Sequence, residues 1–205
     1  MILGIDSYSE QLGLSLIKDH KVIYSISLSK FKPFSEAIVL KLDEMFKELE
    51  LDKSLLKKIV VNKGPGSYTG LRVGITVAKI LSYGLGIDIY SYISLDVMAY
   101  KHRCFNGNII CGINAGKGEL YFREYLSKDF KLEPVSQISI QKQKDFQENF
   151  KNKENTLFVF KNLELEGINS LQILEPLTVE GIFYALKNNL KEDPVSLEPV
   201  YIRPS

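Results

Sequence analysis

The sequence predicts an α/β protein in which a mixed β-sheet is covered by helices, and three observations support this. Three short apolar runs with partial alternation follow one another from the N-terminus, joined by polar turns, which is typical of an antiparallel meander. Strand-like and helix-like segments alternate after them. A glycine-rich loop at residues 64–74 then separates a strand from a long apolar helix, and glycine and proline favour such a tight connection.

In the first half of the chain, the helix after the meander has apolar residues at helical spacing, a charged opposite face and Ser35 as its expected N-cap. A basic segment, 30–34, leads into it. The helix after the glycine loop carries apolar groups all round, so we expect it to be buried on most sides. The elements expected in this half are the strands 2–5, 13–17, 22–28, 59–62 and 87–92 and the helices 35–50, 70–86 and 94–103.

The second half begins at the turn signal Asn106-Gly107-Asn108, which we interpret as a subdomain boundary. The chain is therefore expected to divide into subdomains 1–106 and 107–205. Gly116-Lys117-Gly118 predicts a hairpin turn between two strands. The elements expected in this half are the strands 109–114, 119–126, 132–140 and 156–160 and the helices 142–151 and 179–190.

Composition places few limits on function. A chain of 205 residues suits one large domain or two small ones, and its formal net charge of +1 gives no general nucleic-acid or membrane signal. No apolar run approaches the roughly 18 residues of a membrane-spanning helix, and no signal peptide is expected. Cys104 and Cys111 are interpreted as reduced core thiols of a cytosolic protein.

The glycine loop is the most distinctive stretch of the sequence. A glycine-rich loop that opens a helix presents backbone N–H groups and can hold an anion. Both common phosphate-loop spacings fail here, because three residues separate the second and third glycines and Leu71 follows Gly70. Ser67 and Thr69 are the N-cap candidates of the following helix. A tight structural turn and an anion site both remain open, and the candidate anion-binding residues are Asp6, Gly64, Gly66, Ser67, Thr69 and Gly70.

Small residues recur at every fourth position of that helix, at Gly70, Gly74, Ala78, Ser82 and Gly86. Such a row forms a ridge that lets a neighbouring element approach closely. The neighbour is either the 35–50 helix of the same chain or a second, intermolecular partner, and the sequence leaves both open.

Catalytic chemistry has little support in the sequence. Asp6 closes the first strand, but the turn after it contains no glycine and is poorly shaped for a phosphate. His20 and His102 are far apart and lack a partner four residues on, so no metal site is expected. No nucleophile has a sequence context that indicates activation.

The loop Gly64-Pro65-Gly66-Ser67-Tyr68-Thr69-Gly70-Leu71-Arg72-Val73-Gly74 closely resembles the signature of the TsaB (YeaZ) family, bacterial proteins of the tRNA threonylcarbamoyladenosine pathway. Three further segments are similar to that family: Ile5-Asp6-Ser7, Ser94-Leu95-Asp96-Val97-Met98-Ala99 and Glu198-Pro199-Val200-Tyr201-Ile202-Arg203. The resemblance implies an actin-like/sugar-kinase-like fold with two subdomains, each with a mixed sheet, and a reduced second subdomain.

The resemblance also implies a function. It predicts a cytoplasmic, non-catalytic protein without a cofactor that forms a heterodimer with a TsaD-type enzyme, which transfers threonylcarbamoyl to adenosine 37 of tRNAs reading ANN codons. A TsaE-type ATPase joins the complex, the isolated chain is expected to homodimerise, and direct contact with tRNA is left open. The family contact uses the helices at 35–50 and 70–86. The interface residues expected here are Gly70, Leu71, Gly74, Ala78, Ser82, Ile38, Leu42 and Met45.

Two departures from the family pattern stand out. Phe34 occupies a position where a histidine is common, and the hairpin Asn114-Ala115-Gly116-Lys117-Gly118-Glu119-Leu120-Tyr121 lacks an acidic and an arginine side chain found in many members. Other hypotheses are a small phosphotransferase or ATPase that uses Asp6 and the 64–70 loop, a peptidase, or a self-associating structural protein.

Overall fold

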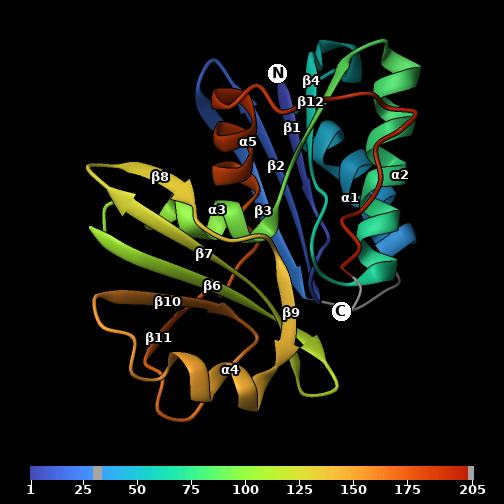
Figure 1. Ribbon diagram of the computed structural model, residues 1–205. Coiled ribbons are helices and arrows are strands. Elements are labelled where there is room, and N and C mark those ends of the chain that lie inside the picture. The colour runs from blue at the N-terminus through green and yellow to red at the C-terminus, as the bar shows by residue number, and fades with distance from the viewer. Residues whose placement is uncertain (30–33, 203–205) are drawn as a thin grey trace. The chain divides into compact units, whose positions relative to one another are not determined.

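The computed structural model describes residues 1–29 and 34–202 (Figure 1). The predicted basic segment 30–34 lies outside these residues except for the backbone of Phe34, and so does Arg203 of the C-terminal signature. The chain forms two compact units. The first comprises Met1–Ser94 and Glu175–Val200, and the second comprises Leu95–Leu174 together with Tyr201 and Ile202.

The first unit is built on a six-stranded mixed sheet in the order β12-β5-β4-β1-β2-β3. The predicted meander is confirmed, because β1 pairs antiparallel with β2 and β2 with β3, whereas β4 and β5 are parallel to β1. The strands are β1 (Ile2–Asp6), β2 (Gln11–Lys18), β3 (Lys21–Ser29), β4 (Lys58–Asn62), β5 (Asp88–Tyr92) and β12 (Lys191–Glu192).

Helices cover both faces of this sheet (Figure 1). The helices are α1 (Phe34–Glu48), the short 3₁₀ helix η1 (Lys53–Leu55), α2 (Tyr68–Leu85) and α5 (Thr178–Lys187). Neighbouring residues of β1 show the two faces, since a Cβ at Gly4 would meet Ile182 of α5, whereas Ile5 lies under Gly74 of α2. Because successive side chains of a strand point to opposite faces, α2 and α5 lie on opposite sides of β1.

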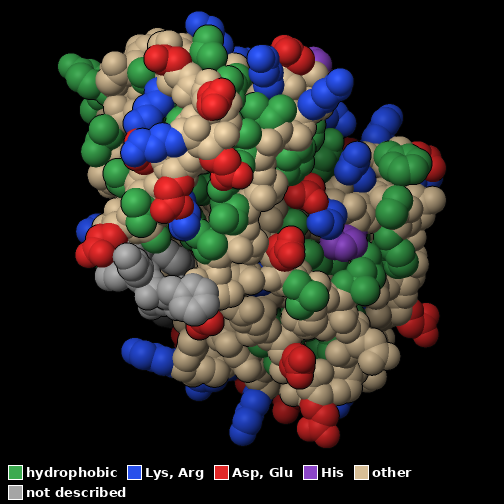
Figure 2. Space-filling model, turned by 180° about the vertical axis from the view of Figure 1, so that it is seen from behind, with side chains coloured by type: hydrophobic (Ala, Val, Ile, Leu, Met, Phe, Trp, Pro, Cys, Tyr) green, Lys and Arg blue, Asp and Glu red, His purple; other side chains and the backbone are tan. Residues whose placement is uncertain are grey.

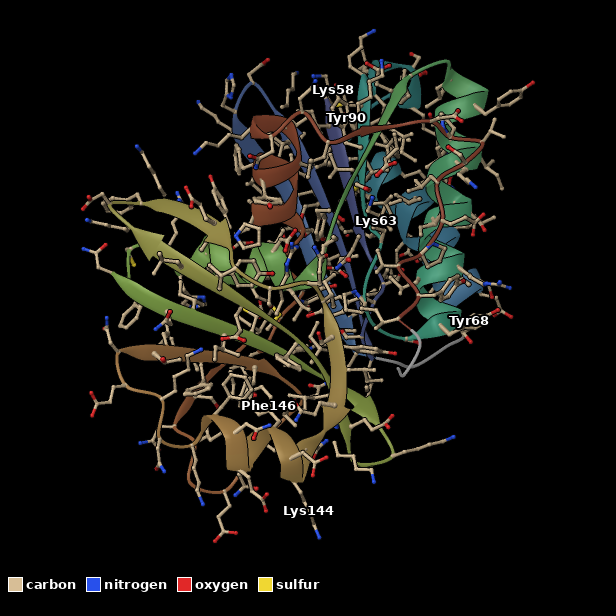
Figure 3. All side chains as sticks on the ribbon, in the orientation of Figure 1. Lys58, Lys63, Tyr68, Tyr90, Lys144 and Phe146 are labelled. Carbon is tan, nitrogen blue, oxygen red and sulfur yellow. The ribbon has the colours of Figure 1, made fainter. Side chains whose placement is uncertain are left out.

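The second unit has its own sheet, in the order β11-β10-β6-β7-β8, with β9 also paired to β7. Its elements are α3 (Ser94–Lys101), which begins at the last residue of the first unit, β6 (Gly107–Gly116), β7 (Glu119–Lys128), β8 (Lys131–Pro134), β9 (Ser139–Lys142), α4 (Gln143–Phe150), β10 (Thr156–Lys161) and β11 (Ser170–Gln172). Phe146 of α4 packs against four phenylalanines that come from the sheet and the end of α4 (Figure 3). This aromatic cluster is the centre of the unit's core.

Several boundaries differ from the sequence prediction. The division into units differs from the single boundary predicted at 106/107, because residues 175–200 return to the first unit. There, α5 packs on β1 and β4, and β12 pairs with β5 of the first sheet. The single strand expected at 132–140 is two strands, β8 and β9. Between them, Ser136 accepts hydrogen bonds from the β7 residues Arg123 and Glu124 instead of continuing the ladder. Ser35 lies inside the first turn of α1 rather than at its N-cap.

Candidate functional site

Asp6, the sequence's candidate catalytic or metal-binding carboxylate, is fully enclosed at the end of β1. Its Oδ1 accepts hydrogen bonds from the Asn62 side-chain amide at 3.2 Å and the Tyr8 backbone N–H at 3.3 Å. Its Oδ2 accepts one from the Tyr92 hydroxyl at 2.9 Å. Burial, and then the neighbouring Asp6 carboxylate, raise the pKa of Tyr92 well above its usual range, so this phenol stays a donor.

Asn62 links this carboxylate to the glycine loop. Its Oδ1 accepts hydrogen bonds from the Gly64 backbone N–H at 2.8 Å and from the Ser94 hydroxyl at 3.0 Å. Asp6, Asn62 and Ser94 are all buried. Asp6 ends β1, Asn62 ends β4 and Ser94 begins α3, so this network fixes two strand ends, a helix start and the loop relative to one another.

The glycine loop packs closely against the chain just after β1. The Ser67 N–H donates to the Tyr8 carbonyl at 2.6 Å, and a Cβ placed on Gly66 would lie 2.3 Å from that same oxygen. The Gly70 N–H donates to the Ser67 hydroxyl at 3.3 Å, which makes Ser67 the N-cap of α2 and leaves Thr69 in its first turn. Within this loop, the backbone N–H groups of Gly64, Ser67 and Gly70 therefore donate to other groups of the first unit. To bind an anion, these N–H groups would have to point away from the fold.

The residues predicted for the partner interface lie inside the first unit. Gly74 of the small-residue ridge faces the end of β1 in the same chain: a Cβ on Gly74 would lie 2.2 Å from the hydroxyl oxygen of Ser7, the residue after β1, and that hydroxyl donates to the Gly70 carbonyl at 2.8 Å. A side chain enclosed in the unit's own core has no surface to offer a partner. All eight residues expected at the interface are buried in this way: Gly70, Leu71, Gly74, Ala78, Ser82, Ile38, Leu42 and Met45.

The exposed apolar residues of α1 and α2 lie elsewhere on these helices. The relative exposure is 88% for Tyr83 and 65% for Ile80. The prediction that α2 is buried on most sides was therefore wrong. Their spacing of three places them on one face of the helix, and this is the signal that sequence reasoning missed. We call this set of residues the outer helical face: Val39, Leu40, Tyr68, Ile80 and Tyr83.

Tyr68, at the first turn of α2, carries a second feature of the outer helical face (Figure 3). The Arg72 guanidinium lies 4.3 Å from the centre of its ring. An arginine stacked on an aromatic ring holds both groups in a fixed position. Exposed aromatic and arginine side chains of this kind are enriched in protein–protein interfaces.

In the second unit, Asp96 is the centre of a buried ionic network. The carboxylate of Asp96 accepts hydrogen bonds from Arg123 at 2.8 Å and from the Tyr125 hydroxyl at 2.6 Å, which ties α3 to β7. Burial, and then the Asp96 carboxylate, raise the pKa values of Tyr125 and Cys111 well above their usual ranges. Cys111 is a buried thiol as predicted, whereas Cys104 is exposed and is not part of the core.

The Gly116-Lys117-Gly118 turn joins β6 and β7 as predicted, and all three residues have positive φ. Among residues 1–29 and 34–202, no group of three or more His, Cys, Asp or Glu side chains is arranged to hold a metal ion. The helices within that part of the chain are all too short or too polar to cross a membrane. Positive and negative side chains are intermingled on the face seen in Figure 2.

The comparisons with known proteins agree on one family. The family model TsaD, tRNA N6-adenosine threonylcarbamoyltransferase, matches residues 29–172. The TsaB protein of Bacillus subtilis, named for tRNA threonylcarbamoyladenosine biosynthesis, is 36% identical over 134 residues, which cover 65% of this chain and 58% of that protein. The TsaB protein of Escherichia coli is 27% identical and is matched over 60% of this chain and 54% of its own length. The matched part thus spans less than two thirds of these relatives.

Solved structures show the same fold over nearly the whole chain. A Pseudomonas aeruginosa protein described as similar to peptidase YeaZ superposes with a TM-score of 0.80 and covers 98% of this chain and 99% of its own, at 15% identity. The structure called YeaZ from the same organism has a TM-score of 0.78 over the same shares. The fold is thus of the actin-like/sugar-kinase-like class, with a mixed sheet in each unit. The chain belongs to the family that the TsaD model describes and, within it, to the TsaB (YeaZ) proteins.

Proposed function

We propose that this chain is a non-catalytic partner of a TsaD-type enzyme in threonylcarbamoyl transfer to adenosine 37 of tRNAs that read ANN codons. Membership of the family supports the pathway, because the curated relatives are named for tRNA threonylcarbamoyladenosine biosynthesis. In this proposal a TsaE-type ATPase joins the same complex, and the complex works in the cytoplasm without a cofactor bound to this chain.

The observation that carries the proposal is the outer helical face. Exposed apolar residues scattered singly are normal, but here Ile80 and Tyr83 lie on one face of α2 and are largely exposed. Val39 and Leu40 add two exposed apolar side chains on α1, which packs against α2. Exposed apolar and aromatic side chains on two helices that pack together fit a protein partner better than solvent.

The state of Asp6 supports a partner role over catalysis by this chain. A carboxylate that acts on a substrate or metal must present an oxygen to it, yet Asp6 is fully buried and both its oxygens accept hydrogen bonds. The alternative is a phosphotransferase, an ATPase or a peptidase that uses Asp6 and the Gly64–Gly70 loop. Calorimetry with ATP and Mg²⁺ distinguishes the partner role from an ATP-using enzyme. Asp6-dependent hydrolysis of ATP by the isolated chain would favour the enzyme.

The partner proposal is tested by charge substitution on the outer helical face. Tyr83→Glu and Ile80→Glu should each weaken binding to the co-purified TsaD-type enzyme at least tenfold, because each places a charge in an apolar contact. Leu174→Glu is the matched control, since Leu174 is a 75% exposed apolar residue outside α1 and α2. Equal affinity of all three variants and the wild type would contradict the proposal.

The same residues should govern self-association. An apolar face without its partner tends to pair with a second copy, so the isolated chain is expected to homodimerise through the outer helical face. Sedimentation should show that the TsaD-type enzyme competes with the homodimer. Modification that proceeds at full rate in a reconstituted system without this chain would refute its role in the pathway.

A further inference from the structure

Two hairpin turns, one in each unit, share an unusual composition. The β2–β3 turn reads Lys18-Asp19-His20-Lys21, and the β7–β8 turn reads Lys128-Asp129-Phe130-Lys131. Each is the turn between the second and third strands of an antiparallel meander in its own sheet, and each lies at the free end of its hairpin (Figure 1). A lysine, an aspartate, a planar ring and a second lysine therefore occupy equivalent positions in both units.

The backbone of both turns favours other residues. The central pair has φ values of 50° and 63° in the first turn and 50° and 61° in the second. Two-residue hairpin loops with positive φ at both positions prefer Asn-Gly, because glycine adopts this conformation without steric cost. Phe130 is unfavourable at the second position, because bulky residues rarely adopt positive φ, whereas histidine, as at His20, is found there more often.

The positions of the lysines in both turns are also unfavourable. Lys18 pairs directly with Lys21 across the first hairpin, and Lys128 with Lys131 across the second. Like charges directly opposite each other on neighbouring strands repel. All four lysines are exposed, and among the described residues none of them forms an ion pair. A bound anion between each pair would relieve this repulsion.

We propose that these two turns contact unpaired RNA, with the lysine pairs on phosphates and the Phe130 and His20 rings stacked on bases. The ring of Phe130 is 67% exposed, and His20 is exposed as well. Phenylalanine and histidine differ in hydrophobicity, but both present a flat ring on which a base can stack. This shared property favours RNA over a lipid surface, which would select for an apolar side chain in both turns, and over an acidic peptide, which needs no ring.

The inference rests on the proposed function, in which the RNA is the tRNA substrate of the complex. Its test nevertheless uses the isolated full chain without any partner enzyme, so the two proposals can fail separately. Fluorescence anisotropy is measured with a labelled stem–loop RNA and with a fully paired RNA duplex of equal length. The wild type should bind the stem–loop more tightly than the duplex, because only the unpaired loop offers bases for stacking.

Phe130→Gly is the decisive variant because it removes the ring and also relieves the positive φ. We expect a higher denaturant midpoint but stem–loop binding that is roughly 5- to 150-fold weaker, the range for loss of one stacked base. Asn189→Gly is the matched control, since Asn189 is exposed and has a φ of 50°. The control should raise the midpoint without changing RNA affinity. Unchanged stem–loop affinity in Phe130→Gly would overturn the proposal.

The lysine pairs are tested through salt dependence. Replacing both Lys128 and Lys131 by Gln should lower the slope of log affinity against log salt by about 1.4, because each phosphate contact with single-stranded nucleic acid contributes about 0.7. The control replaces two other exposed lysines by Gln: Lys144 of α4 (Figure 3) and Lys151, the C-cap residue of that helix. An equal change of slope in the control would show that the effect depends only on the total charge of the chain, and it would overturn the proposal. Phe130-dependent binding to anionic phosphatidylserine vesicles, with no RNA binding, would also overturn it.

Discussion

At the scale of single residues, α2 lies very close to the end of β1 at Gly74. The Ser7 hydroxyl is buried beneath it and donates to the Gly70 carbonyl one turn earlier in α2. Glycine weakens a helix interior by about 1 kcal/mol relative to alanine. The sequence retains it because a Cβ at this position would overlap the Ser7 oxygen.

Two glycines of the same helix give a matched prediction. Gly74→Ala should lower the free energy of unfolding by about 1–3 kcal/mol, because the buried Ser7 must move and its hydrogen bond weakens. Gly84→Ala should raise it by about 0.5–1 kcal/mol, since a Cβ there has no neighbouring atom within 4 Å. Urea denaturation of both variants checks this, and an equal effect of the two substitutions would contradict it.

The packing of the small residues of α2 was only partly predictable from the sequence. Their spacing of four predicted a close approach, and Gly74 confirms one. The spacing could not say what approaches, because a ridge fits a strand, a helix or a partner equally well. At Gly74, the structure places Ile5 of β1 and the following Ser7 in this position.

At the scale of elements, α2 has defined ends. Ser67 caps its N-terminus, and Gly86 ends it with φ at 63°, a left-handed conformation in which glycine is the usual C-terminal residue. Gly86 therefore stops the helix, although the predicted ridge includes it. The helix boundaries were predictable within about two residues because capping leaves a sequence signal.

The two N-cap candidates of α2 give an element-scale prediction. Ser67→Ala should destabilise the first unit by about 1 kcal/mol, because the Gly70 N–H loses its side-chain acceptor. Thr69→Ala should change stability by less than about 0.5 kcal/mol, since Thr69 is an exposed residue of the first turn. Thermal unfolding followed by circular dichroism measures both. A larger loss for Thr69→Ala would show that the cap is wrongly assigned.

Short strands were the elements that the sequence did not reveal. β11 and β12 have three and two residues, too few for an alternating pattern. They form because a paired strand is already in place: β10 lies beside β11, and β5 lies beside β12. Strands of this kind are set by tertiary contacts, not by local sequence.

At the scale of the whole molecule, each unit has its own core. The first core joins aliphatic side chains from the sheet, α1 and α2, and the second is dominated by phenylalanines around Phe146. Each unit also contains a buried tyrosine that donates to a buried carboxylate, Tyr92 to Asp6 and Tyr125 to Asp96. The two units therefore share a dependence on pH.

Alkaline conditions should destabilise the folded chain. Burial raises the pKa values of Tyr92 and Tyr125 above 10 and that of Cys111 above 9, so the folded chain retains protons that the unfolded chain releases. This stability is fully present below the unfolded pKa values and is lost as pH rises above about 9 to 10. Each group should add about 1.4 kcal/mol of lost stability per pH unit in that window.

The tyrosine contribution is isolated by substitution. Tyr92→Phe should lower the unfolding free energy at pH 7 by about 1–3 kcal/mol, because Asp6 loses a donor, and should flatten the alkaline slope by about 1.4 kcal/mol per pH unit. Tyr83→Phe serves as the control, since its ring is exposed. Denaturant titrations from pH 8 to pH 11 measure the slopes, and parallel slopes for the wild type and Tyr92→Phe would refute the assignment.

By itself, the sequence determined the α/β class, most strand and helix positions, the capped start of α2 and the family, because periodicity, capping residues and the glycine loop are local signals. Only the tertiary structure decided which side of each helix the sheet covers. That choice buried the predicted interface residues, exposed Ile80 and Tyr83 instead, and enclosed Asp6 between Tyr92 and Asn62. These outcomes depend on contacts between residues far apart in the chain, and the local pattern of a single segment does not encode them.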